Sequence, residues 1–422
     1  MNILYAVHQF FPKHYTGTER FVLNLSRQMQ RMGHRVKVLT YGITETEGFT
    51  KTVHKFLVKE YTYQGIDVIS IRHKEIPSDV SFTIFDPDYE QVLEESVFTE
   101  EFDILHIAHP MRVGQVLKVA DELGIPSVVT LTDFWLFCPR GIAVTSTGKM
   151  CSDPEKGSKC IRECYGYGWK DKILKRFNES VEFLKRVDVV VSPTKFLAGI
   201  FKQVYGIDVR VIRHGIDYTT VKPNRRYKKK GDTVVFGYIG TVLPHKGAHI
   251  ICEALKLIEN ENIRVKIYGH YFHEVEYYRN LVKEAQKDRR IELLGEYKDE
   301  ELSRIMNEVD CTIVPSIWWE NSPLTVLTSL AYKVPVITIN IGGAAELVKD
   351  GVNGFNFNIG DPDSLANILE RIANNPEILN RIRENVVRPP RIEEEAFKYE
   401  KIYKIFVGEK TLDRGVGCLS YI

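Results

Sequence analysis

The chain has few of the features that mark a membrane-spanning, secreted or nucleic-acid-binding protein. No run of about 18 apolar residues is present, so the sequence predicts no bilayer-spanning helix. The formal net charge of its 422 residues is only +1, which gives no whole-protein argument for nucleic acid. The first residues, 1–7, lack the basic region and cleavage site of a secretion signal. We therefore expect a cytoplasmic protein without a nucleic-acid partner.

Cysteine is scarce outside one short, loop-rich region. Four of the seven cysteines lie within 27 residues, at Cys138, Cys151, Cys160 and Cys164. Four thiolates could bind a structural zinc ion tetrahedrally, or an iron–sulfur cluster. Disulfides, which the cytosol disfavours, and unlinked thiols are the alternatives. The pattern favours a structural metal at these four residues.

The composition and the periodicity indicate an α/β protein. A hydrophobic content of 44% and a charged content of 27% are ordinary for a globular chain of two or three domains. Short apolar runs alternate with helical patterns, which favours parallel, doubly wound sheets. Strands are expected at 2–7, 35–40, 67–71, 104–107, 127–131, 188–192, 210–212, 234–239, 264–268, 291–294, 311–314 and 336–339. The segment 44–101 is expected to contain loops and helices besides its one strand.

The stretch 310–354 carries the strongest chemical signal. It contains two strand-to-helix turns, the first with Glu320 and the second with the pair Gly342-Gly343. A helix is expected to start at Pro323, capped by Asn321 or Ser322. Helix N-termini have unpaired N–H groups and a positive dipole end, so the two turns suit an anionic ligand such as a diphosphate.

The same stretch resembles the donor-binding signature of family 4 glycosyltransferases. The matching motifs are ENSPL at 320–324, SLA at 329–331, GGAAELV at 342–348 and DGVNG at 350–354. The resemblance implies retaining enzymes that use nucleotide sugars. It also implies the GT-B fold, in which two Rossmann-like domains face each other and a C-terminal helix crosses back to the first. We place these domains at 1–217, completed by 393–422, and at 218–392, with the cysteines as an insertion at about 138–164.

The resemblance also assigns candidate residues to the donor, a UDP- or GDP-type sugar. Lys246 matches a lysine that faces the diphosphate, and Glu320 matches a carboxylate that holds the donor sugar, so both are the candidate catalytic residues. Thr241 and Thr328 stand where the family has an arginine and a ribose-binding glutamate. The candidate donor-binding residues are Gly17, Lys246, Gly295, Tyr297, Glu320, Asn321, Ser322, Leu324, Thr328, Gly342 and Gly343. No catalytic metal is expected.

Candidate acceptor residues follow two strands of the first domain. His109 comes after the strand at 104–107, and Thr132 and Asp133 come after the strand at 127–131. Ligands of open α/β sheets lie at the carboxyl ends of strands. Thr132 replaces a histidine of the family.

We expect transfer of the sugar to a hydroxyl of a glycan, lipid or small molecule by front-face attack. Three family residues are replaced, by Thr132, Thr241 and Thr328. These replacements motivate an alternative, a catalytically impaired binding protein. A nucleotide-sugar epimerase of the same fold is a further alternative.

The stretch 169–186 predicts a basic amphipathic helix. Such a helix could attach the protein to the inner face of a membrane, where lipid acceptors are found. We favour the simpler interpretation, a helix that covers the sheet and exposes a solvated basic face.

Overall fold

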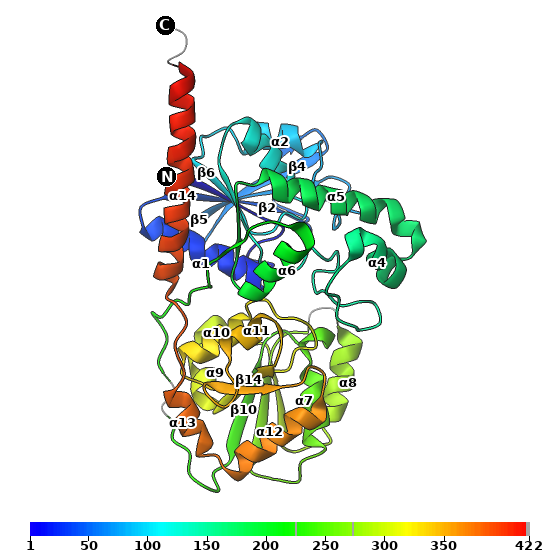
Figure 1. The fold of residues 1–422 in the computed structure, drawn as a ribbon, viewed down its shortest axis with the longest axis vertical. Helices are drawn as coiled ribbons and strands as arrows, with labels where there is room; N and C mark the ends of the chain where they lie inside the picture. Colours follow the sequence, from blue (N-terminus) through cyan, green and yellow to red (C-terminus); the bar gives the residue numbers. More distant parts are fainter. Residues whose placement is uncertain (224–225, 272–273, 419–422) are drawn as a thin grey trace. The chain divides into compact units, whose positions relative to one another are not determined.

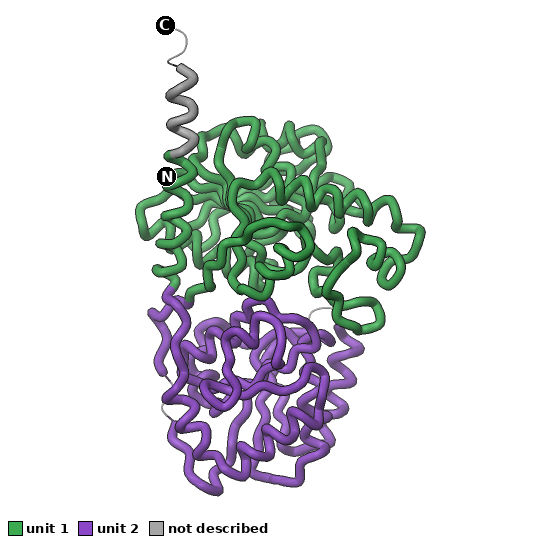
Figure 2. The backbone as a smooth tube through the Cα atoms, viewed as in Figure 1, with its two compact units in different colours: residues 1–215, 392–422 green, residues 216–391 purple. Residues whose placement is uncertain are grey.

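The computed structural model describes residues 1–223, 226–271 and 274–418. The chain divides into two compact units (Figure 2). Unit 1 comprises Met1–Gly215 and Ile392–Ile422, and unit 2 comprises Ile216–Arg391. This division falls next to the expected boundaries at 217/218 and 392/393. Each unit has its own sheet and its own hydrophobic core.

Unit 1 is built on a nine-stranded sheet with the order β3-β4-β5-β2-β1-β6-β7-β8-β9. The parallel strands are β1 (Asn2–Val7), β2 (Arg35–Tyr41), β5 (Ile66–His73), β6 (Ile104–Ile107), β7 (Ser127–Thr130), β8 (Val189–Ser192) and β9 (Arg210–Val211). The central strand β1 has later strands on both sides, so the sheet is doubly wound, as predicted. Every residue of β6, β7 and β8 is buried, which explains their mainly apolar sequences.

One edge of this sheet corrects the prediction of loops and helices over 44–101. Strands β3 (Lys51–Val53) and β4 (Phe56–Tyr63) form an antiparallel hairpin, and β4 also pairs antiparallel with β5. The sheet is therefore mixed rather than wholly parallel. From Phe56, buried and more exposed positions alternate along much of β4, so the hairpin lacks the continuous apolar run that marked the other strands. Helix α2 (Tyr89–Ser96) follows later in the same segment.

Helices cover the sheet of unit 1 (Figure 1). They are α1 (Gly17–Arg31), α3 (Gln115–Glu122), α5 (Lys170–Arg186), α6 (Lys195–Tyr205) and α14 (Ile392–Cys418), with short turns at Glu155–Gly157, Ser158–Cys160 (α4), Ile161–Tyr165 and Tyr167–Trp169. The C-terminal helix α14 packs beside α1, so the predicted return of the chain to its first domain is confirmed.

A buried hydrogen-bond network joins α14 to the sheet. Tyr403 Oη lies 2.5 Å from His106 Nδ1, and Thr130 Oγ1 lies 2.8 Å from His106 Nε2. Tyr399 Oη lies 2.9 Å from Thr130 Oγ1, and Tyr5 Oη lies 3.3 Å from Tyr403 Oη. Burial lowers the pKa of His106 to about 3, so the imidazole is neutral at physiological pH.

Unit 2 has a six-stranded parallel sheet with the order β12-β11-β10-β13-β14-β15. The strands are β10 (Val234–Ile239), β11 (Ile263–Tyr268), β12 (Ile291–Gly295), β13 (Cys311–Val314), β14 (Val336–Ile339) and β15 (Gly354–Phe357). The edge strand β15 was not predicted. Helices are α7 (Ala248–Leu255), α8 (Val275–Ala285), α9 (Leu302–Glu308), α10 (Leu324–Ala331), α11 (Gly342–Leu347), α12 (Pro362–Asn374) and α13 (Ile378–Glu384).

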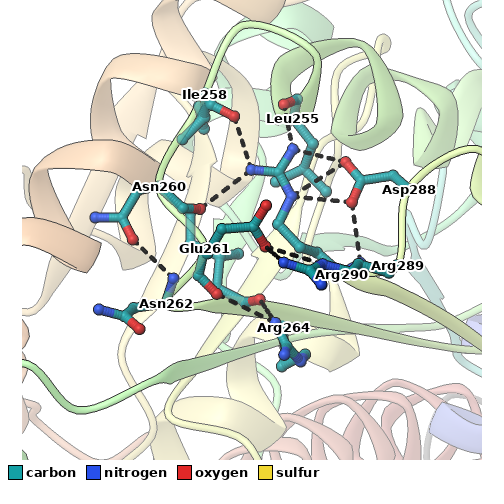
Figure 3. A network of polar contacts seen from close by, with 10 residues as sticks. Leu255, Ile258, Asn260, Glu261, Asn262, Arg264, Asp288, Arg289 and Arg290 are labelled. Atoms are coloured by element: carbon teal, nitrogen blue, oxygen red, sulfur yellow. Dashed lines mark hydrogen bonds and ion pairs between the residues drawn. The ribbon is translucent and has the colours of Figure 1, made fainter.

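Arg290, just before β12, secures the end of α7 (Figure 3). Its guanidinium donates to the carbonyl oxygens of Leu255 (2.6 Å), the last residue of α7, and of Ile258 (2.7 Å), and it pairs with Asp288 at 2.6 Å. These bonds fix the distance between α7 and the sheet, and α7 follows the loop that carries Lys246.

No helix within the described residues is long and apolar enough to cross a membrane. The predicted basic helix is α5, and many of its charges are paired. Lys172 lies 3.6 Å from Asp79, and Arg186 lies 2.6 Å from Asp121. Ile173 and Phe177 are buried against unit 1. Attachment of α5 to a membrane stays a prediction.

Candidate functional site

The turns that follow β10 and β13 are locked together by their backbones. Gly247 has a φ of +74°, and a Cβ there would lie 1.9 Å from the carbonyl oxygen of Pro315. The backbone N–H of Ile317 donates to the carbonyl oxygen of His245 at 2.9 Å. Only glycine allows this close approach, so the chain around Lys246 has a fixed place against the turn after β13.

Lys246 and Glu320 meet within this locked region. Lys246 Nζ lies 2.7 Å from Glu320 Oε1, which also accepts hydrogen bonds from Ser316 Oγ (2.6 Å) and Trp318 Nε1 (3.0 Å). Burial acts to raise the pKa of Glu320, but the charge of Lys246 and these bonds outweigh it, so the pKa is lowered. The Glu320 carboxylate is therefore ionised although its side chain is only 5% exposed.

The second glycine turn packs directly on the first. The backbone N–H of Gly343 donates to the carbonyl oxygen of Glu320 at 2.7 Å. Gly342 has a φ of +79°, and a Cβ there would lie 3.0 Å from the same oxygen. The two strand-to-helix turns thus adjoin each other, as the sequence indicates.

The start of α10 differs from the prediction. The helix begins at Leu324, one residue later than expected, with Pro323 in the N-cap position. Pro323 stands in the N-cap position where Asn321 or Ser322 was expected, and no side-chain hydrogen bond caps the helix from that position. Asn321 is buried against the turn, while Leu324 and Thr328 are half-buried.

Two further donor-binding candidates, Gly295 and Tyr297, lie at the end of β12 and just after it. Gly295 has a φ of +73°, and its carbonyl oxygen accepts from the N–H of Gly269 at 2.7 Å. Gly269 in turn packs so tightly on Gly240 that a Cβ on Gly269 would lie 1.7 Å from the carbonyl oxygen of Gly240. Tyr297 is half-buried, and its ring centroid lies 6.3 Å from that of Tyr268.

The three candidate acceptor residues come together in unit 1. His109 Nε2 lies 3.1 Å from Asp133 Oδ2, and the backbone N–H of Met111 donates to His109 Nδ1 at 3.3 Å. Nδ1 is therefore an acceptor, and Nε2 carries the proton toward Asp133. Thr132 Oγ1 donates to the carbonyl oxygen of Ala108 at 3.0 Å.

Gly17 lies near the same residues, but no steric contact requires a glycine at this position. Thr18, its neighbour in α1, donates from Oγ1 to Thr132 Oγ1 at 2.9 Å. A Cβ on Gly17 would meet nothing within 4 Å. Gly17 itself is exposed at the first position of α1.

Two buried residues beside His109 were missed in the sequence. The ring of His8 lies 4.0 Å from that of His109, and its Nε2 lies 3.7 Å from Glu19 Oε1. Burial, with smaller effects of His109 and Arg112, lowers the pKa of His8 well below its usual value. Burial raises the pKa of Glu19 despite a bond from Thr16 Oγ1 at 2.6 Å. His8 directly follows β1, so the rule that found His109 could have found it.

Two missed residues in unit 2, Ser316 and Trp318, hold the Glu320 carboxylate. Trp318 and Trp319 directly precede Glu320 in the sequence, but no pattern predicted which side chain the Trp318 N–H would contact.

A separate cavity of about 730 Å³ lies in unit 1 beside the end of β5. Its lining includes His54, Lys74, Lys175 and the pair His73–Asp86, in which Nε2 and Oδ2 lie 3.0 Å apart. It contains none of the predicted site residues, so its size alone does not make it the candidate site.

The four clustered cysteines are unlinked. Within the described parts of the chain, no three cysteine, histidine, aspartate or glutamate side chains are arranged so that they could hold one metal ion. Burial raises the pKa of Cys138 and Cys151, and that of Cys160 to about 12. The metal site expected from the sequence is thus not formed in this arrangement.

Two known protein families match this chain, and together the matches include most of its residues. Residues 15–220 match the family described as Glycosyltransferase Family 4, and residues 222–388 match the one described as Glycosyl transferases group 1. A UDP-Gal:alpha-D-GlcNAc-diphosphoundecaprenol alpha-1,3-galactosyltransferase of Escherichia coli is 27% identical over 304 residues, 68% of this chain and 70% of that enzyme. A D-inositol 3-phosphate glycosyltransferase of Corynebacterium aurimucosum is 24% identical over 379 residues, 84% of this chain and 82% of that enzyme.

Solved structures agree in fold. A sucrose-phosphate synthase of Thermosynechococcus elongatus matches with a TM-score of 0.72 at 16% identity, covering 97% of this chain and 99% of that one. Anabaena HepE in complex with UDP and glucose matches with a TM-score of 0.67 at 17% identity, covering 96% and 99%. At these identities the likeness shows the fold, GT-B. The chain belongs to the family 4 glycosyltransferases, enzymes that transfer a sugar from a nucleotide-sugar donor.

Proposed function

We propose that this enzyme transfers the sugar of a nucleoside diphosphate sugar to an acceptor hydroxyl with retention of anomeric configuration. The observation that carries the proposal is the Lys246–Glu320 pair, held by glycine contacts in unit 2. A fixed cation beside a fixed carboxylate suits a donor that combines a diphosphate with a polyhydroxyl sugar.

Lys246 opposes the charge of the diphosphate. Its side chain is 27% exposed, so the ammonium can reach a ligand while Glu320 keeps it in position. As the bond between the sugar C1 and the phosphate oxygen breaks, negative charge builds on the leaving group. A pre-positioned ammonium stabilises that charge more in the transition state than in the ground state.

Glu320 holds hydroxyls of the donor sugar. Its Oε1 already accepts three hydrogen bonds, whereas no donor among the described residues contacts Oε2. An ionised carboxylate only accepts hydrogen bonds, so Oε2 suits a sugar hydroxyl. Because its pKa is lowered, Glu320 is poorly suited to deliver a proton.

The acceptor attacks from the face that the diphosphate leaves. The acceptor oxygen forms the new bond to C1, and its proton passes to an oxygen of the departing diphosphate, so no dedicated base is required. In unit 1, His109, Thr132 and Asp133 are proposed to contact the acceptor. Because His109 Nδ1 already accepts a backbone hydrogen bond, the ring is better placed to orient a hydroxyl than to take its proton.

UDP is the proposed nucleotide. It appears in the HepE complex and in the donor of the Escherichia coli relative. The two named relatives differ in the acceptors their names give, a diphosphoundecaprenol-linked sugar and an inositol phosphate, so a panel of both classes is the starting point for the acceptor.

A thermal-shift panel tests the donor site. UDP, GDP, ADP and their common sugar derivatives are added to wild type, Lys246→Ala and the control Lys256→Ala, whose exposed lysine pairs with Glu284 near the end of α7. Ligands of the native state raise the unfolding midpoint with occupancy. We expect UDP to stabilise wild type and the control but not Lys246→Ala. No shift with any nucleotide would overturn the proposed site.

Product analysis tests the stereochemistry. The anomeric configuration of the sugar in the product, measured by NMR coupling constants, should equal that in the donor. An inverted product would contradict the front-face mechanism. Release of free sugar in the absence of any acceptor would favour the epimerase alternative instead.

A further inference from the structure

The cavity beside the end of β5 has walls from four separate segments of unit 1. The turn between β3 and β4 contributes the first wall, the end of β5 the second, the loop 77–88 the third and α5 the fourth. Its volume of about 730 Å³ is typical of pockets that hold a small ligand or one part of a larger ligand. The cavity is therefore built by the fold of unit 1 and not by one loop.

Hydrogen bonds hold these walls in place. His73 Nε2 lies 3.0 Å from Asp86 Oδ2, and His73 Nδ1 lies 2.9 Å from Tyr41 Oη. The backbone N–H of Lys74 donates to the carbonyl oxygen of Lys55 at 2.8 Å, which ties the end of β5 to the turn before β4. Because these groups already contact one another, the cavity is preorganised for a ligand.

The lining of the cavity is polar, and its charges nearly balance. It contains four carboxylates and three ammonium groups, with two imidazoles besides, so it has no marked excess of positive charge for an anion. The side chains of Lys74 and Glu75 make no hydrogen bond or ion pair within the described residues, so a donor and an acceptor are available to a ligand. A hydroxyl group both donates and accepts hydrogen bonds, so this lining suits a sugar better than a phosphate.

The cavity lies at the edge of the sheet that also carries the proposed acceptor residues. Strands β5, β2, β1 and β6 are parallel neighbours in that order, so their carboxyl ends share one edge. Neighbouring strands lie about 4.8 Å apart, so the ends of β5 and β6 are roughly 14 Å apart. A single sugar cannot span this distance, whereas a short oligosaccharide can.

A row of contacts connects the cavity to His109. The guanidinium carbon of Arg112 lies 5.8 Å from the ring centroid of Tyr41, and the Arg112 backbone N–H donates to the carbonyl oxygen of Thr83, a lining residue, at 3.0 Å. Arg112 Nη1 donates to the carbonyl oxygen of His8 at 3.4 Å, and the ring of His8 lies 4.0 Å from that of His109. The cavity and the proposed acceptor residues therefore adjoin each other along this edge.

We propose that the cavity is a distal acceptor subsite, which binds one sugar unit of an acceptor glycan while another unit presents its hydroxyl beside His109. This proposal rests on the glycosyl transfer proposed above, and it makes the acceptor a glycan chain. Lys74 donates to hydroxyls of the bound unit and Glu75 accepts from them, beside the wall formed by His73 and Asp86. Binding energy from such a remote unit helps to align the reacting hydroxyl with the donor.

An array of immobilised oligosaccharides, together with the monosaccharides that compose them, tests the site. The full-length chain is fluorescently labelled and saturated with UDP. We expect wild type to bind a subset of the oligosaccharides and none of the monosaccharides. Lys74→Ala/Glu75→Ala should weaken this binding about tenfold or more, because it removes two charged hydrogen-bonding groups. Lys185→Ala/Glu122→Ala, a matched control that removes exposed charges elsewhere in unit 1, should bind as wild type does.

The thermal shift with UDP separates the possible causes of failure. Both double variants should keep the wild-type shift, because Lys246 and Glu320 of unit 2 are unchanged. A normal shift without glycan binding would refute the distal subsite and leave the donor site standing. The loss of the shift from wild type would instead refute the donor site.

Trimming a bound oligosaccharide locates the unit that occupies the cavity. Sugars are removed one at a time, and the affinity of each product is measured by biolayer interferometry. For one unit, its removal should weaken wild type about tenfold and weaken Lys74→Ala/Glu75→Ala no further, since both changes remove the same contact. Additive losses at every unit, equal binding by wild type and this variant, or no oligosaccharide bound would each overturn the proposal. Monosaccharides that bind as tightly as the chains would also overturn it, in favour of a small-molecule site.

Discussion

The two candidate sites keep their charged groups in opposite ways. In unit 2, Lys246 and Glu320 form an ion pair, and burial of the carboxylate is offset by three hydrogen bonds. In unit 1, the buried His8 is kept neutral, with a Nδ1 that has no partner among the described residues, and the nearby Glu19 has a raised pKa. The site in unit 2 keeps an ion pair, whereas burial in unit 1 disfavours the charged forms of His8 and Glu19.

This difference corresponds to the proposed ligands. Binding of a diphosphate is favoured by a fixed positive charge. A partly buried cation such as Lys246 is stabilised in place by a carboxylate beside it. An acceptor hydroxyl is neutral and needs only donors and acceptors in suitable places. The charge state of each unit is therefore a property that mutation can test, and the tests below go from the largest expected effect to the smallest.

Glu320→Gln should have the largest effect on catalysis. The substitution leaves Lys246 without its anion and removes an acceptor for the donor sugar. We expect kcat/KM to fall by about 100-fold or more, or roughly 2.7 kcal/mol of transition-state stabilisation. Steady-state kinetics with the donor measures it. Glu308→Gln, which changes a more exposed carboxylate of unit 2 paired with Arg304, serves as control and should stay near wild type. Near wild-type kinetics for Glu320→Gln would remove the charge pair from the mechanism.

Two glycine substitutions, one in each unit, test where the fold requires glycine. Gly247→Ala should lower the free energy of unfolding by about 3 kcal/mol, because its Cβ would collide with the Pro315 carbonyl at a φ of +74°. Gly17→Ala has open space and should change stability by less than about 0.5 kcal/mol. Urea unfolding of both variants gives the comparison.

Activity then tests whether Gly17 belongs to the donor site. If its backbone approaches the diphosphate, an added methyl group should lower kcat/KM about tenfold while stability is unchanged. Unchanged activity would show that glycine at this position serves neither the fold nor the donor.

The sequence predicted unit 2 better than unit 1, and the reason is physical. Gly247 and Gly342 are required by positive φ and by backbone oxygens that a Cβ would approach within 3 Å, so their pattern carries geometric information. The strand-to-helix turns could be predicted for the same reason. The N-cap residue of α10 was predicted wrongly because Pro323 occupies the N-cap position, whereas local rules assign proline to the first turn of the helix itself.

Unit 1 was predicted less fully because its decisive features depend on tertiary contacts. The hairpin of β3 and β4 lies at a sheet edge, where its apolar pattern is broken. His8 is unremarkable in the sequence and becomes notable only through its ring contact with His109. Arg176 of α5 resembles any other basic residue of an amphipathic helix in the sequence, and only the structure shows that it is buried.

The neutral character of unit 1 predicts a pH dependence of stability. The pKa of His106 is about 3 in the folded chain and about 6.5 in the unfolded chain, so the unfolded chain binds more protons between these values. The contribution of His106 is complete above pH 6.5 and is lost as the pH falls toward 3. At pH 5 the loss is about 2 kcal/mol.

The variant His106→Gln should therefore lose less stability than wild type between pH 7.5 and pH 5, measured by urea unfolding. His54→Asn changes an exposed histidine with a φ of 48° and should keep the wild-type dependence. If His106→Gln and wild type lose equal stability, the buried network is not the source of the acid sensitivity.

The smallest effect is expected at the acceptor side, from Asp133→Asn. Asp133 accepts a hydrogen bond from the Nε2–H of His109 at 3.1 Å. Without the carboxylate, the only remaining hydrogen bond among the described residues that orients the His109 ring comes from the backbone N–H of Met111. We expect KM for the acceptor to rise about tenfold, with the nucleotide-induced thermal shift unchanged because the proposed donor residues Lys246 and Glu320 lie in unit 2. If Asp133 acts through His109, the double variant Asp133→Asn/His109→Gln should be no worse than His109→Gln alone. Additive losses would mean that the carboxylate contacts the acceptor itself, and unit 1 would then use a charge as unit 2 does.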